Sequence, residues 1–163
     1  MVEQRELFNK DLKPTGIYYA AGEQIPDGYY DLVVMIAIEN CKGKFLMQKR
    51  SKSKGGGLAV TGGHPKANET ALCGIILEVK EELGISIENY EIKQFWTGIT
   101  GKHIRTMFYV KIDDKIKNIK LQKSEVQKIK WLDVSKIRKL ISKNKLSHNQ
   151  VDFYTKLFEY LKK

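Results

Sequence analysis

The segment spanning residues 63–85 contains three closely spaced glutamates, Glu78, Glu81 and Glu82. On a helix, residues three and four positions apart lie on neighbouring faces, so these carboxylates would repel one another unless a cation joined them. Oxygen ligands at this density suit Mg2+ or Mn2+ better than zinc. The spacing therefore predicts a site for a hard divalent metal.

An amphipathic pattern places these glutamates on a helix. The acids lie beside a stripe of apolar residues that recur at helical spacing: Leu72, Ile75, Ile76, Val79 and Leu83. The helix is expected over residues 68–83. Asn68 is its expected N-cap, Glu69 lies in its first turn, and Gly84 is suited to its C-terminal cap. Gly74 inside the helix costs about 1 kcal/mol relative to alanine, which a close backbone approach by a neighbour would explain.

The same segment resembles the signature of the Nudix superfamily, Gx5Ex7REUxEExGU, in which U is a bulky apolar residue. All but one of the specified positions match, namely Gly63, Glu69, Glu78, Val79, Glu81, Glu82, Gly84 and Ile85. The exception is Leu77, which stands where the family carries an arginine. The resemblance covers nearly the whole chain, because PDGYYDLVV, the QKR sequence and LQKSEVQKIKW are similar to a bacterial Nudix subgroup.

This resemblance implies an α/β fold, an α/β/α sandwich with a mixed β-sheet between helices. It also implies a Mg2+- or Mn2+-dependent hydrolase that cleaves a diphosphate linkage in a nucleoside diphosphate linked to another group. The implied metal ligands are Glu78, Glu81 and Glu82, one of which can act as the base, with the backbone carbonyl of Gly63 completing the shell. Glu125 occupies the place where many members carry a further catalytic acid. Carboxylate-held metal ions neutralise the charge that develops when a diphosphate is hydrolysed.

Contacts to the substrate are expected from Gly63, Arg50 and His64. Arg50 lies at the end of an expected strand opposite the motif loop, where a phosphate contact is plausible and surface solvation equally so. His64 is expected in a loop near the metal. Trp96 and Tyr109 would stack a base or fill the core, and the core is the favoured interpretation.

The GGHP sequence around His64 is also similar to isopentenyl diphosphate isomerase, a Nudix-related enzyme that uses a cysteine. Gly62 stands where that cysteine would be needed, and Cys73 lies on the helix instead. An isomerase is therefore the least favoured alternative. His103 and His148 have no partner spacing that suggests catalysis or metal binding.

Length and composition favour one domain over residues 1–163, with residues 1–30 forming an N-terminal arm packed on it. No apolar run approaches the roughly 20 residues needed to cross a bilayer, and the N-terminus lacks the apolar core of a signal peptide, so a cytoplasmic location is expected. Cys41 and Cys73 lack CxxC spacing and are expected to be reduced thiols.

The net charge of +10 is uneven, because Lys and Arg greatly outnumber Asp and Glu over residues 111–145. A solvated lysine-rich surface is the favoured interpretation, since aromatic residues are not interleaved as a stacking platform requires. Together with Leu77, this stretch leaves an alternative function: a catalytically weak member that binds nucleotide or RNA as a regulatory module. The expected partner is a small-molecule diphosphate derived from a nucleotide, and the sequence leaves open a homodimer.

The elements that must position the glutamates can be read from periodicity and turn residues. Turns are expected at residues 13–16 and 26–28. The expected strands are 32–38, 44–48, 90–99, 105–112 and 129–132, and the expected C-terminal helices are 134–143 and 149–162. The first two strands should form a hairpin, and the next two should pair around Gly101.

Leu77 gives the first test. The family arginine forms ion pairs that orient the catalytic carboxylates, whereas leucine has neither charge nor hydrogen-bond donors. Lys66 or Lys80 can replace the charge in part, but lysine lacks the bidentate fork. We expect Leu77→Arg to raise turnover or metal affinity, measured by phosphate release and by metal titration. No change, or a loss, would show that the site has repacked around leucine.

Overall fold

The computed structural model describes residues 1–113 and 115–163. Its elements in chain order are β1 (Gln4–Phe8), β2 (Pro14–Ala20), β3 (Asp31–Glu39), β4 (Phe45–Arg50), the 3-10 turn η1 (Lys52–Lys54), β5 (Leu58–Ala59), β6 (Thr61–Gly63), α1 (Ala71–Leu83), β7 (Ile92–Thr100), β8 (His103–Lys111), β9 (Val126–Leu132), α2 (Val134–Ser142) and α3 (His148–Leu161).

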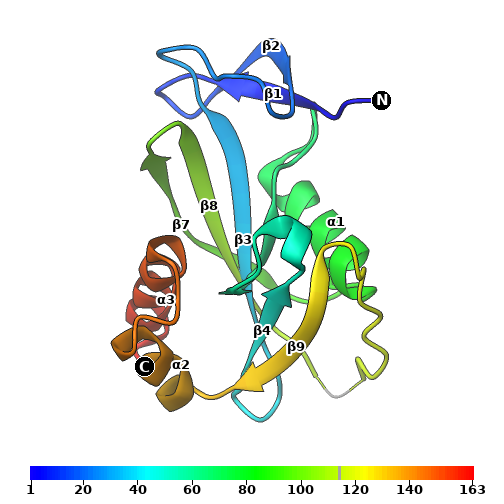
Figure 1. The fold of residues 1–163 in the computed structure, drawn as a ribbon, viewed down its shortest axis with the longest axis vertical. Coiled ribbons are helices and arrows are strands. Elements are labelled where there is room, and N and C mark those ends of the chain that lie inside the picture. Colours follow the sequence, from blue (N-terminus) through cyan, green and yellow to red (C-terminus); the bar gives the residue numbers. More distant parts are fainter. Residues whose placement is uncertain (114) are drawn as a thin grey trace.

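Strand β3 lies at the centre of a mixed sheet (Figure 1). It runs parallel to β8 over its whole length, from Asp31 opposite His103 to Glu39 opposite Lys111. Strand β8 pairs antiparallel with β7 around Gly101, as expected. On its other side, β3 pairs antiparallel with β6.

The sheet splits on that side of β3. The expected hairpin of β3 and β4 forms, but the pairing recorded between them is Glu39 with Phe45. Beyond that pair, β4 turns away and pairs with β9 and with β5. The split leaves an opening between β3 and β4, which is where the candidate site lies.

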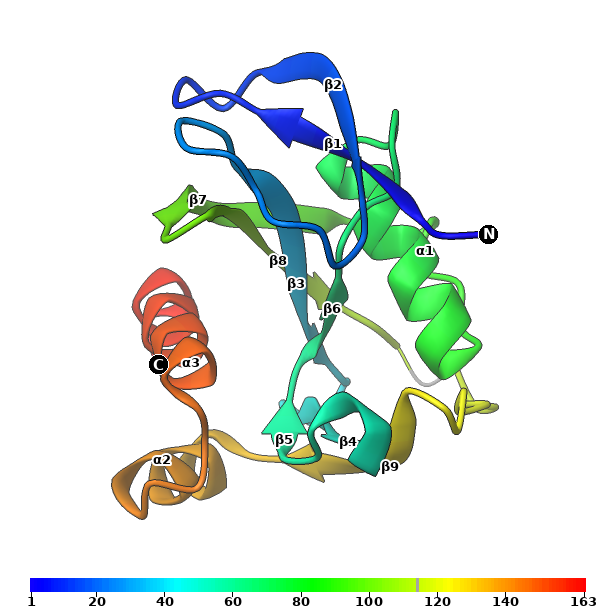
Figure 2. The same ribbon diagram turned by 45° about the horizontal axis from the view of Figure 1, so that its top comes forward.

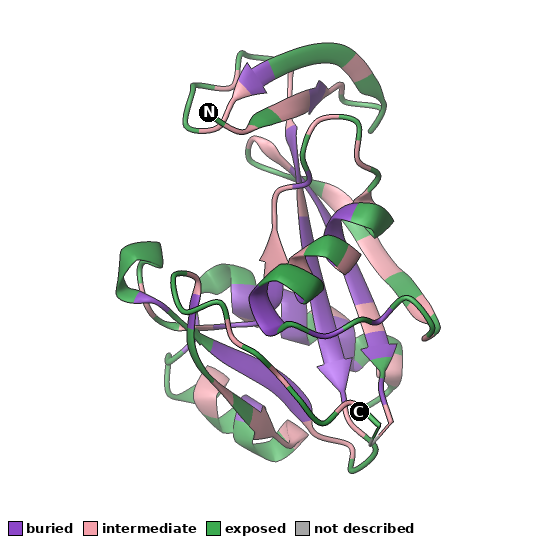
Figure 3. Cartoon of the chain, turned by 90° about the vertical axis from the view of Figure 1, so that its right-hand side faces the viewer, coloured by how far each residue is buried: buried purple, intermediate pink, exposed green. Residues whose placement is uncertain are grey.

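Helices cover both faces of the sheet, which confirms the expected sandwich. Successive residues of β3 face opposite sides, so Val34 and Ile36 pack in the layer that contains α1, while Met35 and Ala37 pack in the layer that contains α2 and α3. Figure 2 shows α1 on one side of the strands and α2 and α3 on the other. The buried residues in Figure 3 concentrate along these strands and on the helix faces that touch them.

The N-terminal segment contains a two-stranded antiparallel sheet, β1 and β2, at one end of the molecule (Figure 1). The turn predicted at residues 13–16 is wrong, because Pro14 already begins β2. Instead the chain turns where the Asn9 side chain accepts hydrogen bonds from the backbone N–H of Asp11 (2.9 Å) and Lys13 (3.1 Å). Asparagine favours turns because its side chain bonds the backbone ahead of it.

Two expectations from composition concern cysteines and membranes. Cys41 and Cys73 are exposed and unbonded to each other, as predicted for reduced thiols. Across residues 1–113 and 115–163, no helix combines the length and the apolar character that crossing a bilayer requires.

Helix α1 begins three residues later than expected. Thr70 is the N-cap, and its hydroxyl accepts a hydrogen bond from the backbone N–H of Cys73 at 3.1 Å. Asn68 is therefore not the cap: its φ of 68° places it in a left-handed turn. Glu69 precedes the helix and accepts a hydrogen bond from the Lys66 N–H at 2.8 Å.

The end and the buried face of α1 follow the sequence more closely. Gly84 caps the helix with a φ of 66°, as predicted. Ile75, Val79 and Leu83 are fully buried. Leu72 differs, because it lies in the first turn, where its side chain is 45% exposed.

Gly74 gives a test of this packing. A Cβ at this position would lie 2.5 Å from Cγ of Pro65, so the close neighbour is a proline ring and not the backbone expected from sequence. We expect Gly74→Ala to lower the free energy of unfolding by about 1–3 kcal/mol, because overpacking outweighs the gain in helix propensity. Urea unfolding measures this, with Cys73→Ala on the exposed face as the control. A variant at least as stable as the wild type would refute the close approach.

Candidate active site

Helix α1 carries the three glutamates predicted as metal ligands, but in different surroundings. Glu82 is 6% exposed and Glu78 is half-buried. Glu81 lies at the surface, where its carboxylate is 3.6 Å from the Lys66 ammonium. The structure therefore brings Glu78 and Glu82 together on the inner side, one helical turn apart, and leaves Glu81 at the rim.

Gly63 and Glu78 fit closely against each other. A Cβ on Gly63 would lie 2.1 Å from Glu78 Oε1, so any side chain here would displace the carboxylate. Strand β6 is held at this place by pairing with β3, where Gly63 is opposite Val34. This close contact explains why a glycine stands at position 63, and the predicted ligation by its carbonyl stays a prediction.

The inner carboxylates have strongly perturbed acidity. Burial is the main cause that raises the pKa of Glu78 from 4.5 to about 7, and the charges of Glu82 and Glu81 add to it. Burial likewise raises the pKa of Glu82 to about 7, although a hydrogen bond from Gln48 Nε2 (3.0 Å) and the charge of Arg50 oppose the shift. A cation beside these groups would favour their charged forms.

The donor set fits a hard divalent ion. Within the described part of the chain, no three His, Cys, Asp or Glu side chains form a ready-made metal cluster. Mg2+ is nevertheless commonly held by only one or two carboxylates, with water and substrate phosphates as further ligands. Glu78, Glu82 and the backbone of Gly63 match that requirement, with Glu81 within reach on the same helix.

Glu125 lies within electrostatic range of the pair, because its charge contributes to the raised pKa values of both Glu78 and Glu82. Its backbone carbonyl accepts a hydrogen bond from the Ser51 N–H (2.9 Å), and its carboxylate is 3.0 Å from the Lys54 ammonium. Loops far apart in sequence therefore place this acid beside α1.

The opening between β3 and β4 forms a cleft of about 290 Å³. It contains residues that the sequence pointed to, namely Arg50, Gly63, His64 and Glu82. It also contains polar residues that sequence reasoning missed, namely Gln48, His103, Arg105, Asn149 and Gln150. The missed residues come from β4, β8 and the start of α3, and no motif links those segments in the sequence.

Asp31 organises one wall of the cleft and was also missed. It is 2% exposed and accepts hydrogen bonds from Tyr19 Oη (2.8 Å) and from His103 Nδ1. His64 Nδ1 lies 2.9 Å from Asp31 Oδ2, an ion-pair distance. Burial alone would raise the pKa of Asp31, but the interactions with His64, His103 and Tyr19 outweigh it and lower the pKa to about 2. A charged Asp31 thus holds the His103 ring by a hydrogen bond and lies close to the His64 ring, whose Nδ1 does not meet hydrogen-bond geometry.

Leu77 stays at the surface with 37% of its area exposed. This position therefore faces solvent and not the core, so an arginine side chain would have room there. Lys66, one proposed substitute for the missing charge, pairs instead with Glu81 at the rim.

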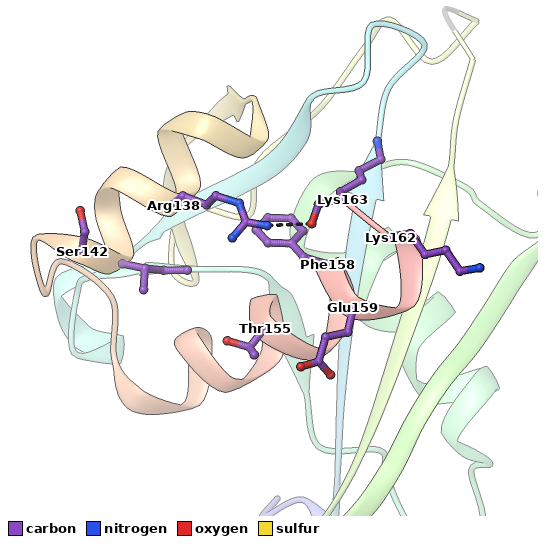
Figure 4. A pocket seen from close by; sticks show the side chains of 8 residues that line it. Arg138, Ser142, Thr155, Phe158, Glu159, Lys162 and Lys163 are labelled. Carbon is purple, nitrogen blue, oxygen red and sulfur yellow. Dashed lines mark hydrogen bonds between the residues drawn. The ribbon is translucent and has the colours of Figure 1, made fainter.

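A larger hollow of about 530 Å³ lies between α2 and α3 (Figure 4). Its Arg138 donates a hydrogen bond to the Lys163 carbonyl (2.7 Å) and lies over the Phe158 ring. None of the predicted site residues lines this hollow. Its chemistry gives no reason to place the active site there.

The pKa shifts of the glutamate pair predict a pH dependence of stability. The folded protein holds protons that the unfolded chain releases between pH 4.5 and about 7, so the free energy of unfolding should fall as pH rises through this window. Removing one charge by Glu82→Gln should reduce that fall by about 1–3 kcal/mol. Urea unfolding at about pH 5 and about pH 8 without divalent metal measures it.

The matched control is Glu88→Gln, a substitution at an exposed glutamate beyond the helix. This control should keep the wild-type difference between the two pH values. An equal fall in the wild type and in Glu82→Gln would contradict the burial of an ionisable pair.

Comparisons with known proteins concern the domain as a whole. A model of the NUDIX domain matches residues 29–157. An uncharacterized Nudix hydrolase of Listeria monocytogenes is 29% identical over 146 residues, which cover 86% of each chain. The crystal structure of DR0079 from Deinococcus radiodurans superposes with a TM-score of 0.73 at 18% identity, covering 89% of this chain and 92% of that one.

A further solved structure, the NUDIX domain of Shewanella oneidensis NrtR complexed with ADP ribose, gives a TM-score of 0.65 at 15% identity, covering 88% of this chain and 94% of that one. The matched domain spans the glutamate helix, the split sheet and most of α3. The chain therefore belongs to the Nudix family and has the Nudix fold.

Proposed function

We propose that this protein is a Mg2+- or Mn2+-dependent hydrolase that cleaves a diphosphate linkage in a nucleoside diphosphate linked to another group. The observation that carries the proposal is the placement of half-buried Glu78 and buried Glu82 one turn apart on α1, with the backbone of Gly63 packed against Glu78. Membership of the Nudix hydrolase family supports it.

In this proposal Glu78, Glu82 and the Gly63 carbonyl hold the metal, with Glu81 as a further ligand from the rim. The bound metal would neutralise charge on the diphosphate and lower the pKa of an attacking water. The chain itself orients Glu82: Thr61 Oγ1 donates to Gln48 Oε1 (3.1 Å), and Gln48 Nε2 donates to Glu82 Oε2 (3.0 Å).

The remaining roles follow from position. Arg50 lowers the pKa of Glu82 through its charge, so it lies where it can bind the diphosphate next to the metal. Glu125, close enough to act on both inner glutamates, is the proposed further acid. His64 lines the cleft with its Nδ1 2.9 Å from Asp31 Oδ2, and contacts the substrate in this proposal.

Two other functions are less well supported. An isomerase needs a cysteine in the cleft, but Cys73 is exposed on α1 and the cleft lining contains neither cysteine. A nucleotide- or RNA-binding module is the other outcome, suggested by Leu77. The basic stretch 111–145, of which residue 114 lies outside the described residues, contributes no residue to the cleft lining.

The test is phosphate or monophosphate release from nucleoside triphosphates, nucleotide sugars, dinucleoside polyphosphates, ADP-ribose and NADH, with Mg2+ or Mn2+. We expect turnover that a chelator abolishes and that Glu82→Gln lowers by about a hundredfold or more, the scale for losing one preorganised electrostatic group. Mg2+ should also raise the melting temperature of the wild type more than that of Glu82→Gln.

Glu88→Gln serves again as the control and should keep both turnover and the Mg2+ effect. Nucleotide binding without turnover on any substrate of the panel would refute the hydrolase. That result would establish a binding module in its place, and salt-sensitive binding of a polyanion would then mark it as an RNA binder.

A further inference from the structure

Arg105 is a charged residue with little exposed surface, and what it exposes lines the cleft. It lies in the middle of the sheet on β8, between Val33 of β3 and Gly98 of β7, and only 7% of it is exposed. It lines the cleft. Among residues 1–113 and 115–163, no side chain or backbone group forms a hydrogen bond or ion pair with its guanidinium.

A guanidinium with so little exposure is stabilised by an oppositely charged partner. Burying a charge without a counter-charge is costly, and native proteins pair such groups. A guanidinium is always charged and presents a planar fork that matches a carboxylate or a phosphate. Because Arg105 faces the cleft, an anion that enters the cleft is the available counter-charge.

The opposite wall also offers donors. Asn149 and Gln150 lie in the first turn of α3, a helix of 14 residues whose N-terminus carries partial positive charge. Gln150 uses its carbonyl oxygen to accept a hydrogen bond from the Val60 N–H (3.0 Å), which fixes its side chain at the cleft. Its amide nitrogen is then left to donate to a ligand.

Arg105 and Arg50 reach the cleft from different strands, β8 and β4. Arg50 and Lys54 are the cations that act on Glu82, so Arg50 belongs with the diphosphate. Arg105 is two residues from His103, which Asp31 holds, and lies on the central part of the sheet. A substrate held at Glu82 thus has a second cation available beyond its diphosphate.

The lining of the cleft suits a compact polar group. Its volume of about 290 Å³ is at the small end for ligand sites. No Phe, Tyr or Trp is among the residues that line it. Phe95 packs on Phe153 with ring centroids 5.6 Å apart, and Trp96 and Tyr109 pack against the same core layer, so these rings do not offer a base-stacking surface there.

We propose that Arg105 binds an anionic group on the non-nucleotide part of the substrate, so that the enzyme prefers nucleoside diphosphates linked to a negatively charged group. The inference rests on the proposed function and names the substrate class for the same cleft. A carboxylate and a phosphate share the recognising chemistry, and matched substrate pairs separate them.

The experiment compares kcat/KM for UDP-glucuronate against UDP-glucose, which differ in one carboxylate, and for ADP-ribose 1″-phosphate against ADP-ribose, which differ in one phosphate. Dissociation constants of the same compounds are measured by calorimetry on Glu82→Gln, with divalent metal present. We expect the wild type to prefer the charged member of at least one pair by about tenfold or more, the scale of a charge-assisted hydrogen bond.

Arg105→Met should bring that ratio close to one and leave the neutral member little changed. Arg105→Gln, which keeps donors but not charge, should do the same and serves if the methionine variant does not fold. Arg138→Met is the matched control, because Arg138 lies between α2 and α3 outside the cleft (Figure 4), and it should keep the wild-type ratio.

A wild type that does not discriminate within either pair would overturn the inference, as would an Arg105 variant that keeps the wild-type ratio. Failure of the proposed function looks different: no compound of any kind would be turned over. In that case the ratio of the dissociation constants for the charged and the neutral member of each pair still decides whether Arg105 distinguishes them.

Discussion

The desolvation of Glu78 and Glu82 is the constraint on which the rest of this structure depends. Two carboxylates one helical turn apart are partly or almost fully buried, and burial raises the pKa of each to about 7. This burial costs free energy. It arises because strand β6 places Gly63 against Glu78 and strand β4 brings Gln48 within hydrogen-bond distance of Glu82. A site of this kind is poised for a cation, whose binding would favour the charged forms.

The divergence of β3 and β4 gives this helix access to a ligand. If β4 followed β3 along its length, the inward face of Glu82 would be covered by a continuous sheet. Because β4 pairs with β9 and β5 instead, the gap is lined by residues of β3, β4, β5, β6 and β8, by the loop before α1, by Glu82 of α1 and by the start of α3. Polar groups from several segments therefore meet around Glu82.

The sequence predicted those parts of the site that one local segment encodes. The glutamates, Gly63 and the cap at Gly84 follow from spacing and turn chemistry within a single stretch, and most strands follow from their periodicity. The start of α1 was misplaced because Asn68 is both a good cap and a good turn residue, and Thr70 took the cap.

Asp31 and Arg105 could not be found in that way. Their roles arise from the parallel register of β3 and β8 and from the crossing of α3, which join residues more than seventy positions apart. No local pattern marks such a pairing. A buried charged residue becomes informative only when its neighbours are known, as the unpaired guanidinium of Arg105 shows.

The carboxylate of Asp31 joins parts of the chain that otherwise look independent. It accepts hydrogen bonds from Tyr19 of the N-terminal sheet and from His103 of β8, and it lies 2.9 Å from Nδ1 of His64 in the loop before α1. The N-terminal sheet is therefore connected to the cleft wall through the hydrogen bond from Tyr19 to Asp31. Shortening or exchanging that terminus would remove the Tyr19 hydrogen bond from Asp31 and so loosen one support of the cleft wall that carries His103.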